Sequence, residues 1–127
     1  MYGAVACISE TKNPILAANA LLEHGPHCML VGQAADDMSK KRGLEIVHNK
    51  HFTTALRLKH WEQNKQKNYP NTDSDFGTVG AIVLDSYGHL AAGGSTGGTS
   101  CKARGRVGDT AVLGAGLYAD SKVAVVW

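Results

Sequence analysis

The distribution of apolar and polar positions divides the chain into a helical first part and a β-rich second part. The segment "ILAANALLEH" follows Asn13-Pro14, and its alanines and leucines recur at helical spacing. Asn at the N-cap and Pro at the first helical position are a common helix start, and Gly25-Pro26 supplies the end. The apolar run "CMLV" then predicts a short buried strand, and "YGAVACI" near the start is typical of the middle of a helix or strand.

Two more helices are expected before the composition changes. The segment "QAADDMSKKR" predicts a polar helix closed by Gly43. A third helix is predicted from about Thr53 to Gln66, with Leu56 and either His60 or Trp61 facing inward.

The second part begins after a polar segment. Residues 66–76, "QKNYPNTDSDF", are turn-prone and contain a proline, which indicates an exposed loop or linker of the kind where chains are cut. "TVGAIVLD" and "HLAAGG" then predict two strands joined through Ser86-Tyr87-Gly88. Because "VGAIVL" is apolar at every position, we expect a strand covered on both faces of its sheet. A glycine-rich stretch follows, and "VAVVW" predicts a last strand.

Composition narrows the class of protein. The chain has 127 residues, 43% hydrophobic and 19% charged, which suits one ordinary globular domain, and the predicted helices followed by strands make it α/β in type. A net charge of +2 argues against nucleic acid or a membrane surface as partner, and no apolar run is long enough for a membrane helix. No signal peptide is recognisable, and three scattered cysteines predict a reducing compartment, by default the cytoplasm. No CxxC or HExxH spacing occurs, so we expect no metal.

The glycine-rich stretch admits a nucleotide-binding interpretation, which fails on spacing. A phosphate loop needs GxxxxGK[ST], but Lys102 follows Cys101 rather than a glycine. Residues 114–119, "GAGLYA", fit G-x-G-x-x-A, but no acidic residue follows about 20 positions later to bind a ribose. We therefore expect no nucleotide cofactor.

A lone threonine, Thr78, stands between the linker and the buried strand, and this position suggests a nucleophile created by cutting the chain. A threonine hydroxyl needs an adjacent base, and a newly released α-amine can supply one. Arg106 and Asp109 lie nearby in sequence among glycines. Taken in isolation, Arg106 and Asp109 would form a surface ion pair, and Thr96 would be a turn residue. Together, an Arg fork could hold the α-carboxylate of an amino acid and an Asp its α-ammonium.

Four motifs in series carry a family resemblance: "GTVGAIVLD", "HLAAGGSTGG", "GRVGD" and "GAGLYAD". In this order and spacing they resemble the threonine-nucleophile asparaginase and isoaspartyl peptidase family of N-terminal-nucleophile (Ntn) hydrolases. The resemblance implies part of an αββα sandwich, in the α/β (α+β) class. Residues 1–77 correspond to the C-terminal part of an α subunit, with residues 66–77 as linker. Residues 78–127 correspond to the N-terminal part of a β subunit within the same single domain.

The resemblance also implies a mechanism and a set of roles. Thr78 would attack the carbonyl of Gly77, and hydrolysis of the resulting ester would free the threonine amine. Thr96 would hydrogen-bond the Thr78 hydroxyl, Arg106 would bind the substrate α-carboxylate, and Asp109 its α-ammonium. The reaction would be hydrolysis of L-asparagine or β-aspartyl dipeptides through a β-aspartyl ester, without a cofactor. A homodimer of αβ units is the implied assembly.

The sequence also departs from this pattern. The family's T-G-x-G-E oxyanion segment, its first strand and its cation-binding loop have no counterpart, so the chain is expected to be truncated at both ends. Cys101 replaces a common Asn and Gly94 a common Thr. Two alternatives stay open: an inactive homologue that acts only in folding or association, and glycosylasparaginase-like or taspase-like specificity. Self-cleavage separates the enzyme from the inactive fragment.

Overall fold

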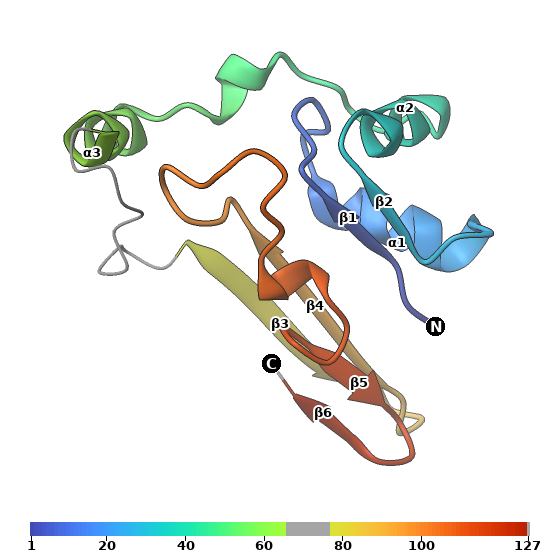
Figure 1. Cartoon of the computed structure of the whole chain (residues 1–127). Helices are drawn as coiled ribbons and strands as arrows, with labels where there is room; N and C mark the ends of the chain where they lie inside the picture. Colours follow the sequence, from blue (N-terminus) through green and yellow to red (C-terminus); the bar gives the residue numbers. More distant parts are fainter. Residues whose placement is uncertain (66–76, 127) are drawn as a thin grey trace.

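The first part of the molecule is a small α/β unit. The computed structural model describes residues 1–65 and 77–126. Strand β1 (Ala4–Ala6) and strand β2 (Met29–Val31) are parallel neighbours, and helix α1 (Pro14–His24) connects them (Figure 1). Helix α2 (Gln33–Lys41) follows directly. The predicted bounds of α1 and α2 are confirmed, whereas β2 is not buried as expected, because Val31 is exposed.

Small residues let these elements pack closely. The buried apolar side chains are those of Ala4, Ala6, Ala17, Leu21 and Ala35. At the start of β1, a Cβ on Gly3 would lie 2.1 Å from the Ala18 carbonyl oxygen, so only glycine allows the chain to pass α1 at this distance.

A buried carboxylate fixes the loop after β1. Asp36 on α2 is only 2% exposed, and it accepts hydrogen bonds from the backbone N–H groups of Ser9, Glu10 and Thr11 at 2.9–3.2 Å. The hydroxyls of Ser9 and Thr11 donate two more, at 3.2 and 2.7 Å. Burial alone would raise the pKa of Asp36, but these hydrogen bonds outweigh it and hold the pKa below the ordinary value of 3.8.

The chain then crosses the molecule through a 3-10 helix, η1 (Asn49–Phe52), to helix α3 (Ala55–Lys65). The third predicted helix is therefore present, but the prediction that Leu56 faces inward is wrong. Leu56 is 60% and Trp61 42% exposed, whereas His60 is half-buried, and α3 has no fully buried residue. Figure 1 shows α3 at the edge of the molecule, beside the loop that follows β4, so the rest of the chain covers it only in part. The linker predicted at residues 66–77 lies outside the described residues except for Gly77.

The second part is built on a β-hairpin, which confirms the predicted pair of strands. Strands β3 (Thr78–Leu84) and β4 (Leu90–Thr96) are antiparallel, with Thr78 opposite Thr96 and Leu84 opposite Leu90. The prediction that β3 is covered on both faces is wrong for this chain. Val79 is 67%, Ile82 48% and Val83 57% exposed, and among the described residues β3 packs chiefly against its hairpin partner β4.

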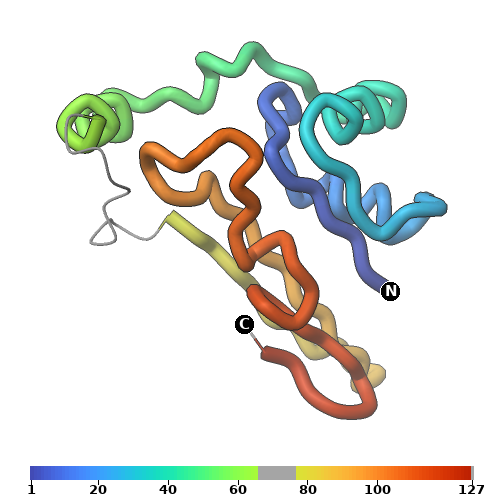
Figure 2. Tube along the Cα trace, in the orientation of Figure 1, coloured from blue at the N-terminus to red at the C-terminus, as the bar shows by residue number. Residues whose placement is uncertain are grey.

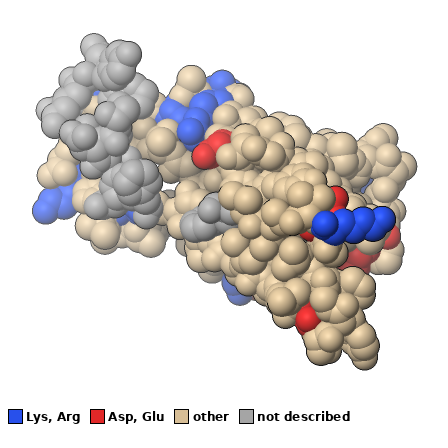
Figure 3. Space-filling model, turned by 90° about the horizontal axis from the view of Figure 1, so that it is seen from below, with Lys and Arg blue, Asp and Glu red and all other residues tan. Residues whose placement is uncertain are grey.

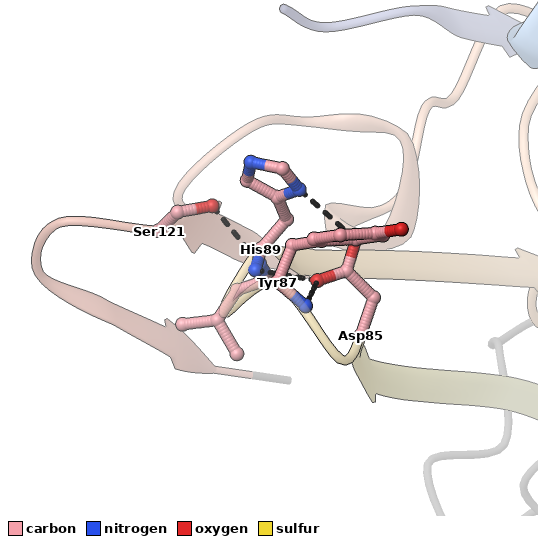
Figure 4. A network of polar contacts seen from close by, with 5 residues as sticks. Asp85, Tyr87, His89 and Ser121 are labelled. Carbon is pink, nitrogen blue, oxygen red and sulfur yellow. Dashed lines mark hydrogen bonds and ion pairs between the residues drawn. The ribbon is translucent and has the colours of Figure 1, made fainter.

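The turn of this hairpin is closed by a polar network (Figure 4). Asp85 accepts the backbone N–H groups of Tyr87 and His89, both at 2.8 Å, and its other oxygen lies 3.0 Å from His89 Nδ1. The His89 backbone hydrogen bond is the main cause of a lowered Asp85 pKa. Ser121 Oγ accepts the Leu90 N–H at 2.9 Å and so ties the start of β4 to the turn that follows β5.

Two further short strands, β5 (Tyr118–Asp120) and β6 (Ala124–Val126), form a second antiparallel pair beside β4. The 3-10 helix η2 (Asp109–Ala111) precedes them. Tyr2 joins this part to the first, because its hydroxyl donates to the Ala111 carbonyl and accepts the Leu113 N–H.

The strands of the described residues form three separate two-stranded sheets, and Figure 2 traces the chain through them. This mixture of helix and strand is compatible with the predicted α+β class, whereas the αββα sandwich stays a prediction. No helix in residues 1–65 and 77–126 has the length and apolarity to cross a membrane.

Candidate functional site

The hairpin register brings two threonine hydroxyls together. Thr78 begins β3 and Thr96 ends β4, directly opposite each other, so their side chains project from the same face. The Thr78 hydroxyl donates to Thr96 Oγ1 at 3.0 Å, and the Gly98 N–H donates to the same oxygen at 3.0 Å. Thr96 thus holds the Thr78 hydroxyl and is itself oriented by the loop that follows.

Helix α3 approaches the residue before the nucleophile candidate. The position that a Cβ on Gly77 would take lies 3.0 Å from Nη2 of Arg57. Arg57 stands in the first turn of α3, and its backbone N–H is bound by the Thr54 hydroxyl at 3.2 Å. A Cβ at position 77 would require this guanidinium to shift by a few tenths of an ångström. Sequence reasoning missed Arg57, because only the fold brings α3 to this place.

Arg106, in the glycine-rich loop, places its guanidinium between Gly98 and Gly108. A Cβ on Gly98 would lie 3.1 Å from Arg106 Nη1 and 3.0 Å from Lys102 Nζ. A Cβ on Gly108 would likewise lie 3.0 Å from Arg106 Nη1. Gly98 also has a φ of +71°, a conformation that suits glycine. The guanidinium therefore lies against Gly98, the residue whose N–H donates to Thr96.

Asp109 stands at the start of η2, immediately after Gly108. Its Oδ1 accepts the N–H of Thr110 at 2.9 Å, which leaves the carboxylate exposed at the surface. Within the described part of the chain no ion pair joins Asp109 to Arg106, so the interpretation as a surface ion pair has no support. The structure connects Thr78, Thr96, Gly98 and Arg106 by contact, but no hydrogen bond there joins Asp109 to them.

Other groups near the site do not form a metal centre. Among the described residues no three His, Cys, Asp or Glu side chains converge. Cys7, Cys28 and Cys101 are free thiols. Cys7 Sγ lies 3.6 Å from the Arg106 carbonyl, and Cys101 Sγ lies 4.0 Å from the Trp61 carbonyl.

Comparison with known proteins gives the class and then the family. The sequence model of the family described as "Asparaginase" matches residues 1–126. An isoaspartyl peptidase of Escherichia coli strain K12 is 39% identical over 133 residues, which cover 98% of this chain and 41% of that protein. An isoaspartyl peptidase/L-asparaginase of Xenopus laevis is 40% identical, covering 98% of this chain and 41% of that protein. The relatives are thus named as hydrolases, and the chain belongs to the asparaginase family.

A relative with a different name matches nearly as well. An N(4)-(beta-N-acetylglucosaminyl)-L-asparaginase of Elizabethkingia miricola is 36% identical, covering 95% of this chain and 36% of that protein. The chain spans less than half the length of the curated relatives it matches.

Proposed function

We propose that this chain is part of a self-cleaving N-terminal-threonine amidohydrolase that acts on L-asparagine, β-aspartyl dipeptides, or both. One observation carries the proposal: the Thr78 hydroxyl, directly after Gly77, is held by Thr96 at 3.0 Å. The names of the relatives support the substrate class.

Self-cleavage begins at the peptide bond between Gly77 and Thr78. The Thr78 oxygen attacks the Gly77 carbonyl carbon, the hydroxyl proton leaves, and the C–N bond breaks as its nitrogen is protonated. This N-to-O acyl shift leaves Gly77 as an ester on Thr78. Water hydrolyses the ester, which releases the Gly77 carboxylate and the free threonine hydroxyl and amine. Thr96 keeps the attacking oxygen in place before the first step.

The freed amine makes Thr78 a competent catalyst. An α-amine titrates near pH ~8, so an appreciable fraction is neutral at physiological pH and accepts the hydroxyl proton. The threonine oxygen then attacks the side-chain amide carbon of the substrate and forms a β-aspartyl ester, while ammonia or an amino acid leaves. A water molecule completes the hydrolysis and regenerates Thr78.

The substrate is oriented by two charges. We assign Arg106 to the α-carboxylate, because its guanidinium lies beside Gly98 at the end of the contact series that begins at Thr78. Asp109 is assigned to the α-ammonium, since one of its oxygens is fixed by Thr110 and the carboxylate is exposed. The homodimer of αβ units and the cytoplasmic location stay predictions from the sequence.

The test is intact-mass spectrometry of the purified chain after a day at neutral pH. We expect two fragments that divide between Gly77 and Thr78, in the wild type and in Thr78→Ser, which keeps a hydroxyl. Thr78→Ala should stay whole, whereas Thr53→Ala, outside the site, should cleave normally. A wild-type chain that is folded by circular dichroism and stays uncut would contradict the proposal and favour the inactive fragment.

If the chain cleaves, substrate assays separate the remaining alternatives. Release of ammonia from asparagine, or of an amino acid from a β-aspartyl dipeptide, is expected after cleavage. Hydrolysis of a glycosylated asparagine instead would point to the specificity named for the Elizabethkingia relative. Cleavage of only a protein substrate would point to the taspase-like alternative.

A further inference from the structure

The loop from Gly97 to Gly108 is unusually positive. It contains Lys102, Arg104 and Arg106 and no acidic residue. Two of these cations converge: Lys102 Nζ and Arg106 Nη1 lie 3.0 and 3.1 Å from the same point, where a Cβ on Gly98 would stand. The proposed mechanism uses only one of the two.

The two cations have no anionic partner. Lys102 Nζ donates to the neutral carbonyl of Gly97, and no acidic side chain pairs with Lys102 or Arg106 within residues 1–65 and 77–126. Like charges held close together repel each other unless an anion lies between or beside them. Both side chains are exposed, so an anion from solution can reach them. This arrangement is therefore suited to a ligand with negative charge.

Gly98 places this cation pair near the reacting hydroxyl. Both cations lie beside the position that a Cβ on Gly98 would take, and the Gly98 N–H donates to Thr96 Oγ1, which holds Thr78. A ligand whose amide carbon reaches Thr78 would thus extend toward Lys102 as well as Arg106. An Arg fork suits one carboxylate in a fixed orientation, whereas a flexible Lys suits a second carboxylate whose position varies.

We propose that Lys102 binds a second substrate carboxylate, that of the departing amino acid, and so favours β-aspartyl dipeptides with a free C-terminus over L-asparagine. The inference rests on the proposed function. A β-aspartyl dipeptide carries the α-carboxylate assigned to Arg106 and also the C-terminal carboxylate of its second residue. L-Asparagine carries only the first, because its leaving group is ammonia.

The experiment compares three substrates in the self-cleaved protein: β-aspartyl-glycine, β-aspartyl-glycinamide and L-asparagine. Only the first has the second carboxylate. We expect Lys102→Gln to raise KM for β-aspartyl-glycine about tenfold, as for loss of one charge-assisted hydrogen bond, with kcat nearly unchanged. KM for the other two substrates should stay within about twofold. Lys102→Arg should restore most of the loss, and Lys122→Gln, on the remote turn between β5 and β6, should change nothing.

Three results would overturn the inference in recognisable ways. An equal loss for all three substrates would show that Lys102 only holds the loop through Gly97. No loss for any of them would show that Lys102 does not contact the substrate. A wild-type chain that cleaves itself but hydrolyses none of the three substrates would contradict the proposed function. The proposed role of Lys102 in specificity would then fail as well.

Discussion

The two parts of the molecule are stabilised in different ways. The buried residues of the described chain all lie in the first part: Ala4, Ala6, Thr11, Ala17, Leu21, Ala35, Asp36 and Ser39. Residues 77–126 contain none, yet every site residue predicted from the sequence lies there. Seen from below, the molecule presents a broad area of uncharged atoms with only scattered charges (Figure 3).

This difference shows what keeps the site in shape. The first part relies on close packing of small side chains and on the buried Asp36 carboxylate. In the second part, the hairpin register sets the distance between Thr78 and Thr96, and Gly98 lets the loop turn back against Arg106. The site is thus held by backbone hydrogen bonds and glycine conformations, so perturbations of the two parts should have separable effects.

The largest effect on the free energy of unfolding is expected for a substitution of Asp36. Asp36→Ala leaves the N–H groups of Ser9, Glu10 and Thr11 without their acceptor, and each buried unpaired donor costs about 1–3 kcal/mol. We expect a loss of at least about 3 kcal/mol, a large share of the 5–15 kcal/mol typical of a domain. Urea unfolding in a Thr78→Ala background measures it without interference from cleavage.

The neighbouring residue is the matched control for this prediction. Asp37 is exposed on the same helix, and its Oδ1 accepts a hydrogen bond from Gln33 Nε2 at 3.2 Å. Asp37→Ala should change the free energy of unfolding by less than about 0.5 kcal/mol. Equal losses for the two variants would contradict the conclusion that the hydrogen bonds of the buried Asp36 carboxylate stabilise the first part.

Gly98→Ala is expected to lower stability less than Asp36→Ala does, and also to lower the activity of the site. Its φ of +71° costs a non-glycine residue about 1–2 kcal/mol, and the new Cβ would meet Lys102 Nζ and Arg106 Nη1 at 3.0 and 3.1 Å. We expect the two cations to be displaced and kcat/KM for asparagine to fall about tenfold or more after self-cleavage.

Gly105→Ala separates strain from displacement. Gly105 has a φ of +81°, but nothing lies within 4 Å of its Cβ position. It should lose similar stability and keep its kcat/KM. If both variants lose activity equally, loop strain rather than the position of the cations controls the site.

The sequence could predict the elements whose signals are local. Asn13-Pro14 and Gly25 mark α1, and the turn residues between β3 and β4 mark the hairpin, because capping and turn chemistry depend on a few adjacent residues. The motifs that led to Thr78, Thr96 and Arg106 are likewise contiguous.

Features that depend on distant residues could not be predicted. The local pattern predicts Asp36 only as part of a polar helix, and the return of the chain after β1 brings Ser9 and Thr11 to it. The approach of Arg57 to Gly77 depends in the same way on where α3 lies. The apolar pattern of β3 indicated a covered strand, but a pattern cannot show whether the covering element belongs to this chain.

The stability of the first part should also depend on pH through Asp36. The Asp36 pKa is lowered in the folded state, so its stabilising contribution is full above the ordinary value of 3.8 and is lost as pH falls through the folded pKa. We expect the urea midpoint to fall as pH decreases below about 4, and to fall less in Asp36→Asn than in Asp37→Asn. A midpoint that depends on pH equally in both variants would assign the effect to other carboxylates.

The smallest effect is expected on the exposed face of β3. Val83 is 57% exposed, and Val83→Thr keeps the β-branched shape while removing apolar surface. We expect a change below about 0.5 kcal/mol in the free energy of unfolding. The same substitution at Val5 of β1 should cost about 1 kcal/mol or more, because it places a hydroxyl at a partly buried position. Val83→Thr could instead cost as much stability as Val5→Thr. If that loss also grows with protein concentration, the face of β3 is covered by another chain in solution. The contrast between a packed first part and an open second part would then hold for the isolated chain only.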